Sequence, residues 1–187
     1  MSKVVIDILI GTGTGIISGI MASVVFFLFL MFVRPKINIS DKICRENSTN
    51  IFRIKIVNKT HSMLMNVKYT LYYCQKSGDG VYVAREISAT ETDLYVISKY
   101  SKKDINAEYA VRVKYEIDDD ICISNGWLEF TICASHGFSN TSTCIKKRYS
   151  NSDISTGIFE TGTSMRILAI PVPAQNTEKG TAMSVIE

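Results

Sequence analysis

Residues 8–33 read ILIGTGTGIISGIMASVVFFLFLMFV, a run without one charged side chain. A helix of this length extends about 40 Å, more than the roughly 30 Å hydrocarbon core of a bilayer. A cleaved signal peptide has a shorter apolar core and ends at a small-residue cleavage site. Here the run ends in bulky residues and is followed by Arg34 and Lys36. We therefore expect a retained transmembrane helix over residues 8–33, preceded by a short N-terminal segment, residues 1–7.

Basic residues are unevenly distributed about this predicted helix. Only Lys3 precedes it, whereas Arg34, Lys36, Lys42 and Arg45 follow it closely. The positive-inside rule then predicts a single pass through the cell inner membrane, with the N-terminus outside and the C-terminal domain in the cytoplasm. Arg34 and Lys36 are expected to contact lipid headgroups, where each charge contributes about 1 kcal/mol near an anionic surface.

Small residues recur along the first half of the same run. Gly11, Gly15, Gly19 and Ser23 are spaced four apart, which places them along one face of a helix. Such a face lets two helix backbones approach closely in lipid. The pattern predicts helix packing through these four residues, either in a homo-oligomer or against another membrane protein. Glycine is also simply common in membrane helices, which is the plainer interpretation.

Residues 34–170 are long enough for one domain, and residues 171–187 are interrupted by prolines and predict a mobile tail. The net charge of +3 and the lack of a basic stripe indicate no nucleic-acid partner. The five cysteines are Cys44, Cys74, Cys122, Cys133 and Cys144. Their odd number and irregular spacing favour reduced thiols in a cytoplasmic domain over a disulfide framework.

Four Asn-X-Ser/Thr sequons begin at Asn38, Asn47, Asn58 and Asn140. They are acceptors for glycans only if the domain faces a glycosylating compartment. Loops rich in Asn, Ser and Thr produce such sequons by chance, and we interpret these four as accidental.

After residue 36 the apolar pattern changes to a period of two. The clearest alternations are over residues 51–58, 64–74 and 109–117, with weaker ones over 36–43, 81–87, 94–98, 127–133, 143–149 and 165–170. Strands this short, separated by turn-forming residues and without a helical period, predict an all-β domain. We expect an antiparallel β-sandwich, with Phe52, Ile54 and Ile56 facing inward and Lys55 and Val57 facing outward.

The segment IFRIKIVNKTHSMLMNVKYTLYY, residues 51–73, resembles a strand pair of bacterial immunoglobulin-like adhesion and adaptor modules. The resemblance implies an immunoglobulin-like β-sandwich and no particular activity. The Cys, Trp and Cys spacing of true immunoglobulin domains is absent.

Candidate chemistry is sparse. Cys133, His136 and Cys144 are soft metal ligands close in sequence, but a structural zinc site needs a fourth. Ser135 and His136 point to opposite faces of a strand and have no orienting acid. Residues 118–120 are three aspartates, which fit a solvated turn better than a calcium loop. Trp127 is expected to point outward or to lie under a loop. The sequence thus predicts no catalytic residue, cofactor or metal.

These features together predict a non-enzymatic membrane protein whose β domain binds a ligand or partner and whose helices self-assemble. The architecture is similar to that of membrane-disrupting effectors of bacterial antiviral systems. An accessory or scaffolding subunit that tethers a larger membrane-associated complex is the alternative. An extracytoplasmic binding module in the reverse orientation is a third class, and it predicts glycans or disulfides.

Overall fold

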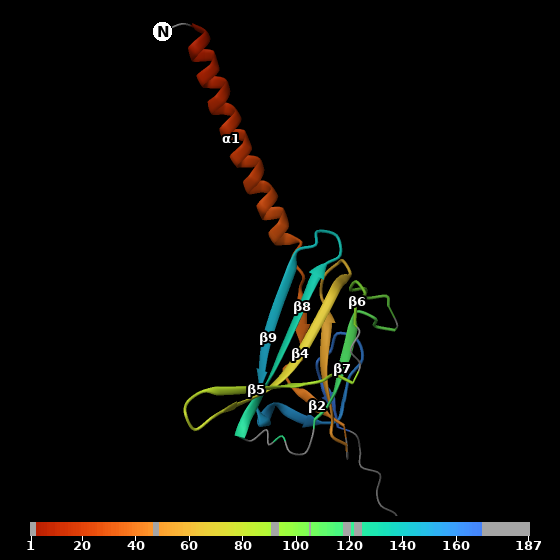
Figure 1. Cartoon of the computed structure of the whole chain (residues 1–187). Helices are drawn as coiled ribbons and strands as arrows, with labels where there is room; N and C mark the ends of the chain where they lie inside the picture. The colour runs from red at the N-terminus through yellow and green to blue at the C-terminus, as the bar shows by residue number, and fades with distance from the viewer. Residues whose placement is uncertain are drawn as a thin grey trace, which may run out of the picture.

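A computed structural model of the chain describes residues 3–46, 49–90, 94–104, 106–117, 121 and 125–169. The predictions for the tail, the aspartates at 118–120, Cys122 and the sequon at Asn47 lie outside these residues. One helix, α1 (Lys3–Phe32), projects from a domain built of β-strands (Figure 1). It is long and apolar enough to cross a membrane, and none of its residues is buried.

The domain contains two main sheets. The first surrounds β3 and consists of β1 (Ile37–Ile39), β2 (Ile43–Arg45), β3 (Ile51–Asn58), β7 (Ala110–Glu116) and β10 (Ile154–Thr156). The second has β4 and β8 at its centre and consists of β4 (Leu64–Lys76), β5 (Tyr82–Ile87), β6 (Val96–Ile97), β8 (Gly126–His136) and β9 (Ser142–Tyr149). A short 3-10 helix, η2 (Asn151–Asp153), joins β9 to β10. A small hairpin of β11 (Ile158–Phe159) and β12 (Ile167–Leu168) forms a third sheet.

The core lies between the two main sheets. Ile54 and Ile56 from the first sheet share it with Leu71 and Phe130 from the second, and all four side chains are fully buried. The Tyr115 ring meets the Phe130 ring edge-on, with centroids 6.4 Å apart. Burying such side chains contributes about 1.5–3 kcal/mol each relative to exposure, so this interface is the main stabilising contact of the domain.

Several strand predictions are confirmed. The alternation over residues 51–58 corresponds to β3, and its predicted inward set is buried. In β4 the pattern shifts, because the register with β8 breaks between Met65 and Lys68 and Asn66 adopts a positive φ of 51°. As a consequence Leu64 is buried and Met65 is exposed.

Two expectations about the sandwich need correction. β10 pairs in parallel with β2, so the predicted purely antiparallel arrangement is wrong at this position. Lys55 and Val57 face away from the core but are 1% and 0% exposed, so the outer face of β3 is not solvated as predicted. The β-rich domain with two facing sheets behind one apolar helix is otherwise as expected.

Candidate functional site

The serine and threonine hydroxyls within α1 are satisfied inside the helix. The Thr12 and Ser23 hydroxyls donate to carbonyls four residues earlier, at 2.8 Å each. Thr14 and Ser18 likewise donate to carbonyls of the preceding turn, at 3.0 Å. Lipid offers no hydrogen-bond partner, so a membrane helix must satisfy its polar groups in this way. The chemistry of α1 therefore fits a hydrocarbon environment.

The predicted helix-packing residues lie on an open face of α1. A Cβ added at Gly11, Gly15 or Gly19 would meet no atom within 4 Å. A shallow groove beside Gly19 and Ser23 is flanked by Ile16 and Phe27. No part of the chain that the structure describes covers this face, which leaves it available to a second helix.

Arg34 and Lys36 are exposed where α1 meets the domain. The carbonyl of Val33 accepts hydrogen bonds from Thr141 Oγ1 at 3.1 Å and, more weakly, from Ser139 Oγ at 3.5 Å. The backbone N–H of Lys36 donates to Thr60 Oγ1 at 2.8 Å. The end of the helix is thus attached to the loops before β4 and before β9.

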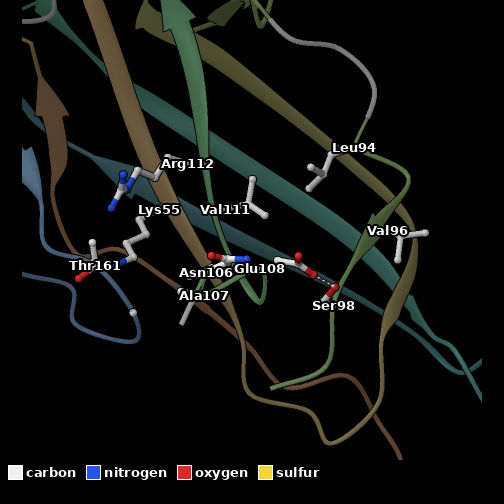
Figure 2. A pocket seen from close by; sticks show the side chains of 12 residues that line it. Lys55, Leu94, Val96, Ser98, Asn106, Ala107, Glu108, Val111, Arg112 and Thr161 are labelled. Carbon is white, nitrogen blue, oxygen red and sulfur yellow. Dashed lines mark hydrogen bonds between the residues drawn. The ribbon is translucent and has the colours of Figure 1, made fainter. Parts of the chain in front are cut away.

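The outer face of β3 and β7 carries two cations side by side. Lys55 lies directly opposite Arg112 in the β3–β7 register, and Figure 2 shows both side chains pointing toward Thr161. Lys55 Nζ donates to the backbone carbonyls of Glu160 and Ser164 at 2.5 and 2.7 Å. These contacts bury the amine under the segment that joins β11 to β12.

The environment of Lys55 disfavours its charged form. Burial is the main cause and the neighbouring Arg112 guanidinium the second; together they lower the pKa of Lys55 to about 8, against the opposing effect of Glu160. Arg112 donates through Nη2 to the carbonyl of Phe159 at 3.2 Å. Among the described residues neither cation forms an ion pair. Like charges directly opposite each other in a sheet are destabilising, so this pair is costly without an anion.

A cavity of about 580 Å³ adjoins the two cations. Its opposite wall comes from Leu94, Val96 and Ser98, and Glu108 adds one carboxylate, which accepts a hydrogen bond from Ser98 Oγ at 3.2 Å. Arg112 keeps several N–H donors that no described residue occupies. Planar guanidinium donors fit carboxylate and phosphate oxygens, so the cavity suits a small anion.

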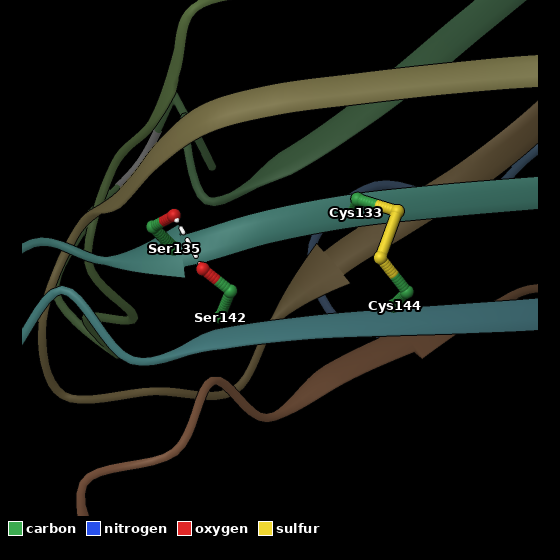
Figure 3. The surroundings of a disulfide bond; sticks show 4 residues. All are labelled: Cys133, Ser135, Ser142 and Cys144. Atoms are coloured by element: carbon green, nitrogen blue, oxygen red, sulfur yellow. Dashed lines mark hydrogen bonds between the residues drawn. A yellow bond between two sulfur atoms is a disulfide. The ribbon is translucent and has the colours of Figure 1, made fainter.

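Cys133 and Cys144 form a disulfide between β8 and β9, on the outer face of the second sheet (Figure 3). Their Cα atoms are 4.1 Å apart, and the two residues are directly paired in the register. The expectation of reduced thiols is therefore wrong for this pair. Cys44 and Cys74 are free and buried, and burial raises the pKa of both thiols.

The alternative chemistries near this pair find no support in the geometry. Cys133 and Cys144, two of the three candidate zinc ligands, are bonded to each other in the disulfide. His136 Nδ1 accepts hydrogen bonds from the backbone N–H groups of Phe138 and Ser139, at 3.3 and 3.2 Å. Ser135 Oγ pairs with Ser142 Oγ at 3.0 Å instead of with a base. His136 therefore has a structural role in the loop.

Trp127 points outward, as one of the two predicted positions requires. Its ring packs edge-on against Tyr82, with centroids 5.3 Å apart, and the Arg148 guanidinium lies over it at 5.2 Å. The buried Nε1 of Trp127 has no hydrogen-bond partner. Packing against Tyr82 and Arg148 therefore accounts for a tryptophan at this position.

The cation pair was not identified from the sequence. Lys55 and Arg112 each occupy an outward position of an alternating strand, which is the common place for a solvated cation. The pairing of β3 with β7 brings the two cations together, and the segment that joins β11 to β12 covers Lys55. Neither feature can be recognised from one strand alone. The strand alternation did place both cations on the outward faces of their strands, but it could not show that they lie next to each other.

Comparison with known proteins assigns no family to this chain. No protein-family model matches it, and no curated protein matches it. Roles are therefore assigned from position and chemistry alone.

Proposed function

We propose that this chain is a non-enzymatic, single-pass membrane protein that binds a small anion in its β domain and self-assembles through α1. The observation that carries this proposal is a thirty-residue apolar helix with no buried residue, joined directly to a domain in which Lys55 and Arg112 lie side by side without an ion pair among the described residues. We further propose an immunoglobulin-like class for the sandwich, on the basis of its two facing sheets and short connections.

The proposed orientation places the N-terminus outside the cell inner membrane and the β domain in the cytoplasm. It is supported by the uneven distribution of basic residues about the apolar run: Arg34 and Lys36 are exposed directly after α1, whereas Lys3, the first residue of α1, is the only basic residue at the other end of the sequence of this helix. Arg34 and Lys36 would then contact the headgroups of the inner leaflet.

Ligand binding is proposed for the cavity beside Lys55 and Arg112. A carboxylate or phosphate there would relieve the repulsion between the two cations, because an opposite charge nearby favours their charged forms. Titration of the detergent-purified protein with AMP should show saturable binding that Arg112→Gln abolishes and that Lys68→Gln, an exposed lysine on β4, leaves unchanged. Equal binding by wild type and Arg112→Gln would remove this part of the proposal.

Self-assembly is proposed for the face formed by Gly11, Gly15, Gly19 and Ser23. Domains that associate on ligand binding would concentrate the helices and favour their packing. This behaviour suits a membrane-disrupting effector of a bacterial antiviral system, and overexpression should then depolarise the cell. Cross-linking in membranes tests assembly: Gly15→Leu with Gly19→Leu should reduce the oligomer severalfold. Ile10→Phe with Ile17→Phe, which enlarges the opposite face, should not.

The disulfide favours a second candidate, an extracytoplasmic binding module in the reverse orientation. Disulfides persist in oxidising compartments and are rare in the cytosol. Exposed sequons at Asn38 and Asn140 fit this candidate, whereas Asn58 is 0% exposed and its side-chain amide donates to two carbonyls. Labelling of intact cells with a membrane-permeant thiol reagent, read out on the peptides that carry Cys133 and Cys144, distinguishes the candidates. A reducing cytoplasm would leave this pair as thiols that react, and an oxidising compartment would preserve the disulfide and leave the pair unlabelled.

A scaffolding subunit remains the alternative function within the same orientation. Its α1 would pack against the helix of a different protein. Co-purification separates the two, since a single species supports the effector and a stable second protein supports the scaffold.

A further inference from the structure

The end of the domain that adjoins α1 exposes large apolar side chains. Phe138, in the loop between β8 and β9, is 80% exposed, and Met63, in the loop between β3 and β4, is 48% exposed. Phe32, the last residue of α1, is 81% exposed. We call residues 59–63 and 137–141 the membrane-proximal loops. Three exposed apolar side chains gathered at one end of a domain indicate a contact surface.

Hydrogen bonds fix the membrane-proximal loops to each other and to the helix end. The N–H of Gly137 donates to the Met63 carbonyl at 2.9 Å, and the N–H of Lys59 donates to the Lys36 carbonyl at 2.8 Å. Together with the bonds from Thr141 and Ser139 to the Val33 carbonyl, they hold both loops at the level where the apolar run ends. Figure 1 shows the loop before β9 beside the end of α1.

The same end of the domain is basic. Residues 33–36, 59–63 and 137–141 contain no Asp or Glu. Arg34, Lys36 and Lys59 are exposed there, and the Lys59 ammonium lies 5.5 Å from the centroid of the Tyr100 ring. A cavity of about 320 Å³ is lined by these three cations together with Phe32 and Phe138. Apolar rings beside cations match the acyl chains and phosphates of an anionic phospholipid.

We propose that the helix end and the membrane-proximal loops form one lipid-binding surface. Phe138 enters the bilayer beside Phe32, while Arg34, Lys36 and Lys59 contact anionic phospholipid headgroups. This proposal rests on the proposed membrane span of α1, because the end of that span sets the level of the bilayer. It adds Lys59 to the headgroup contacts predicted from the sequence and Phe138 as a contact with the acyl chains, and it places the domain directly on the membrane surface.

A tryptophan reporter tests the lipid contact in the full chain. Trp127 is the only tryptophan, so Trp127→Phe gives a silent background. Phe138→Trp then places the reporter in the loop, and Val83→Trp places a matched one on β5, where Val83 is 58% exposed. Both proteins are reconstituted into vesicles of phosphatidylcholine and phosphatidylglycerol with acyl chains brominated near the headgroup, since bromine quenches tryptophan on close approach.

We expect brominated lipid to reduce the Phe138→Trp fluorescence at least twofold and to leave Val83→Trp unchanged. Replacing phosphatidylglycerol with phosphatidylcholine should weaken the quenching, because the three cations lose their anionic partners. Equal, low quenching at both positions in protein that floats with the vesicles would overturn the lipid contact and leave the span intact. Protein that does not float with the vesicles would overturn the span and the contact together.

Discussion

The outer faces of the two sheets pair their side chains in opposite ways. On the β8–β9 face, neighbours across the strands are complementary: Cys133 bonds to Cys144, and Glu129 accepts from Arg148 at 3.1 Å and pairs with Lys146 at 2.7 Å. On the β3–β7 face, Lys55 lies opposite Arg112, another cation. Complementary pairs stabilise a sheet and like charges destabilise it. The first face is therefore built for stability, and the second accepts a cost at the place where a ligand would bind.

The disulfide should contribute the largest share of the stability of the complementary face. For the oxidised protein, Cys133→Ser with Cys144→Ser should lower the free energy of unfolding by about 2–3 kcal/mol, because a short closed loop is released in the unfolded chain. Urea unfolding followed by Trp127 fluorescence measures this change. The adjacent cross-strand pair provides the control, since Ser135→Ala with Ser142→Ala removes one partly buried hydrogen bond. Equal losses of unfolding free energy from the two double variants would show that the disulfide stabilises the face no more than an ordinary cross-strand hydrogen bond does.

The like-charged face should respond to alkaline pH. The folded-state pKa of Lys55, about 8, lies below the value of 10.5 expected in the unfolded chain. Between these pH values the unfolded state binds more protons than the folded state, so the free energy of unfolding rises with pH. The stability gained in this way is lost when the pH is lowered through about 8. From pH 7 to pH 9 we expect a gain on the order of 1 kcal/mol. Urea unfolding of wild type and Lys55→Met gives the difference, and parallel pH profiles would contradict it.

The charge pairs on the complementary face should have the smallest effect. Lys146 and Arg148 side chains are 59% and 69% exposed, so Glu129→Gln should cost about 0.5–1 kcal/mol at low salt and less in 1 M salt. Hydrogen bonding from Lys146 and then Arg148 lowers the pKa of Glu129, despite its desolvation. Its contribution is therefore present above the unfolded-state value near 4.5 and lost as pH falls below it. A loss of unfolding free energy in Glu129→Gln that does not change with salt would indicate that the side chain stabilises the sheet by packing and not by its charge.

Alternation along single strands predicted much of the fold but little of the candidate site. It gave the inward set of β3 because apolar residues there recur at every second position. It could not show that Lys55 is buried, because burial of the outer face depends on a hairpin whose strands have two residues each. The disulfide was missed for a related reason: the pairing of Cys133 with Cys144 is a property of the β8–β9 register, which neither strand specifies alone.

The candidate membrane contacts were partly visible in the sequence. Arg34 and Lys36 follow the apolar run directly, and charge counting identified them. Phe138 was overlooked, although a lone phenylalanine in the polar loop HGFSN was a usable signal. Its significance depends on the hydrogen bonds to the Val33 carbonyl, which link segments more than a hundred residues apart.

Only residues 33–36 separate α1 from β1, and Pro35 among them is buried. So short a connection, bonded at both ends to the domain, leaves little freedom for the two parts to twist independently. If neighbouring domains turn relative to one another, their helices must turn by nearly the same angle. A small rotation outside the bilayer would thereby change which side of each helix faces its neighbour inside it.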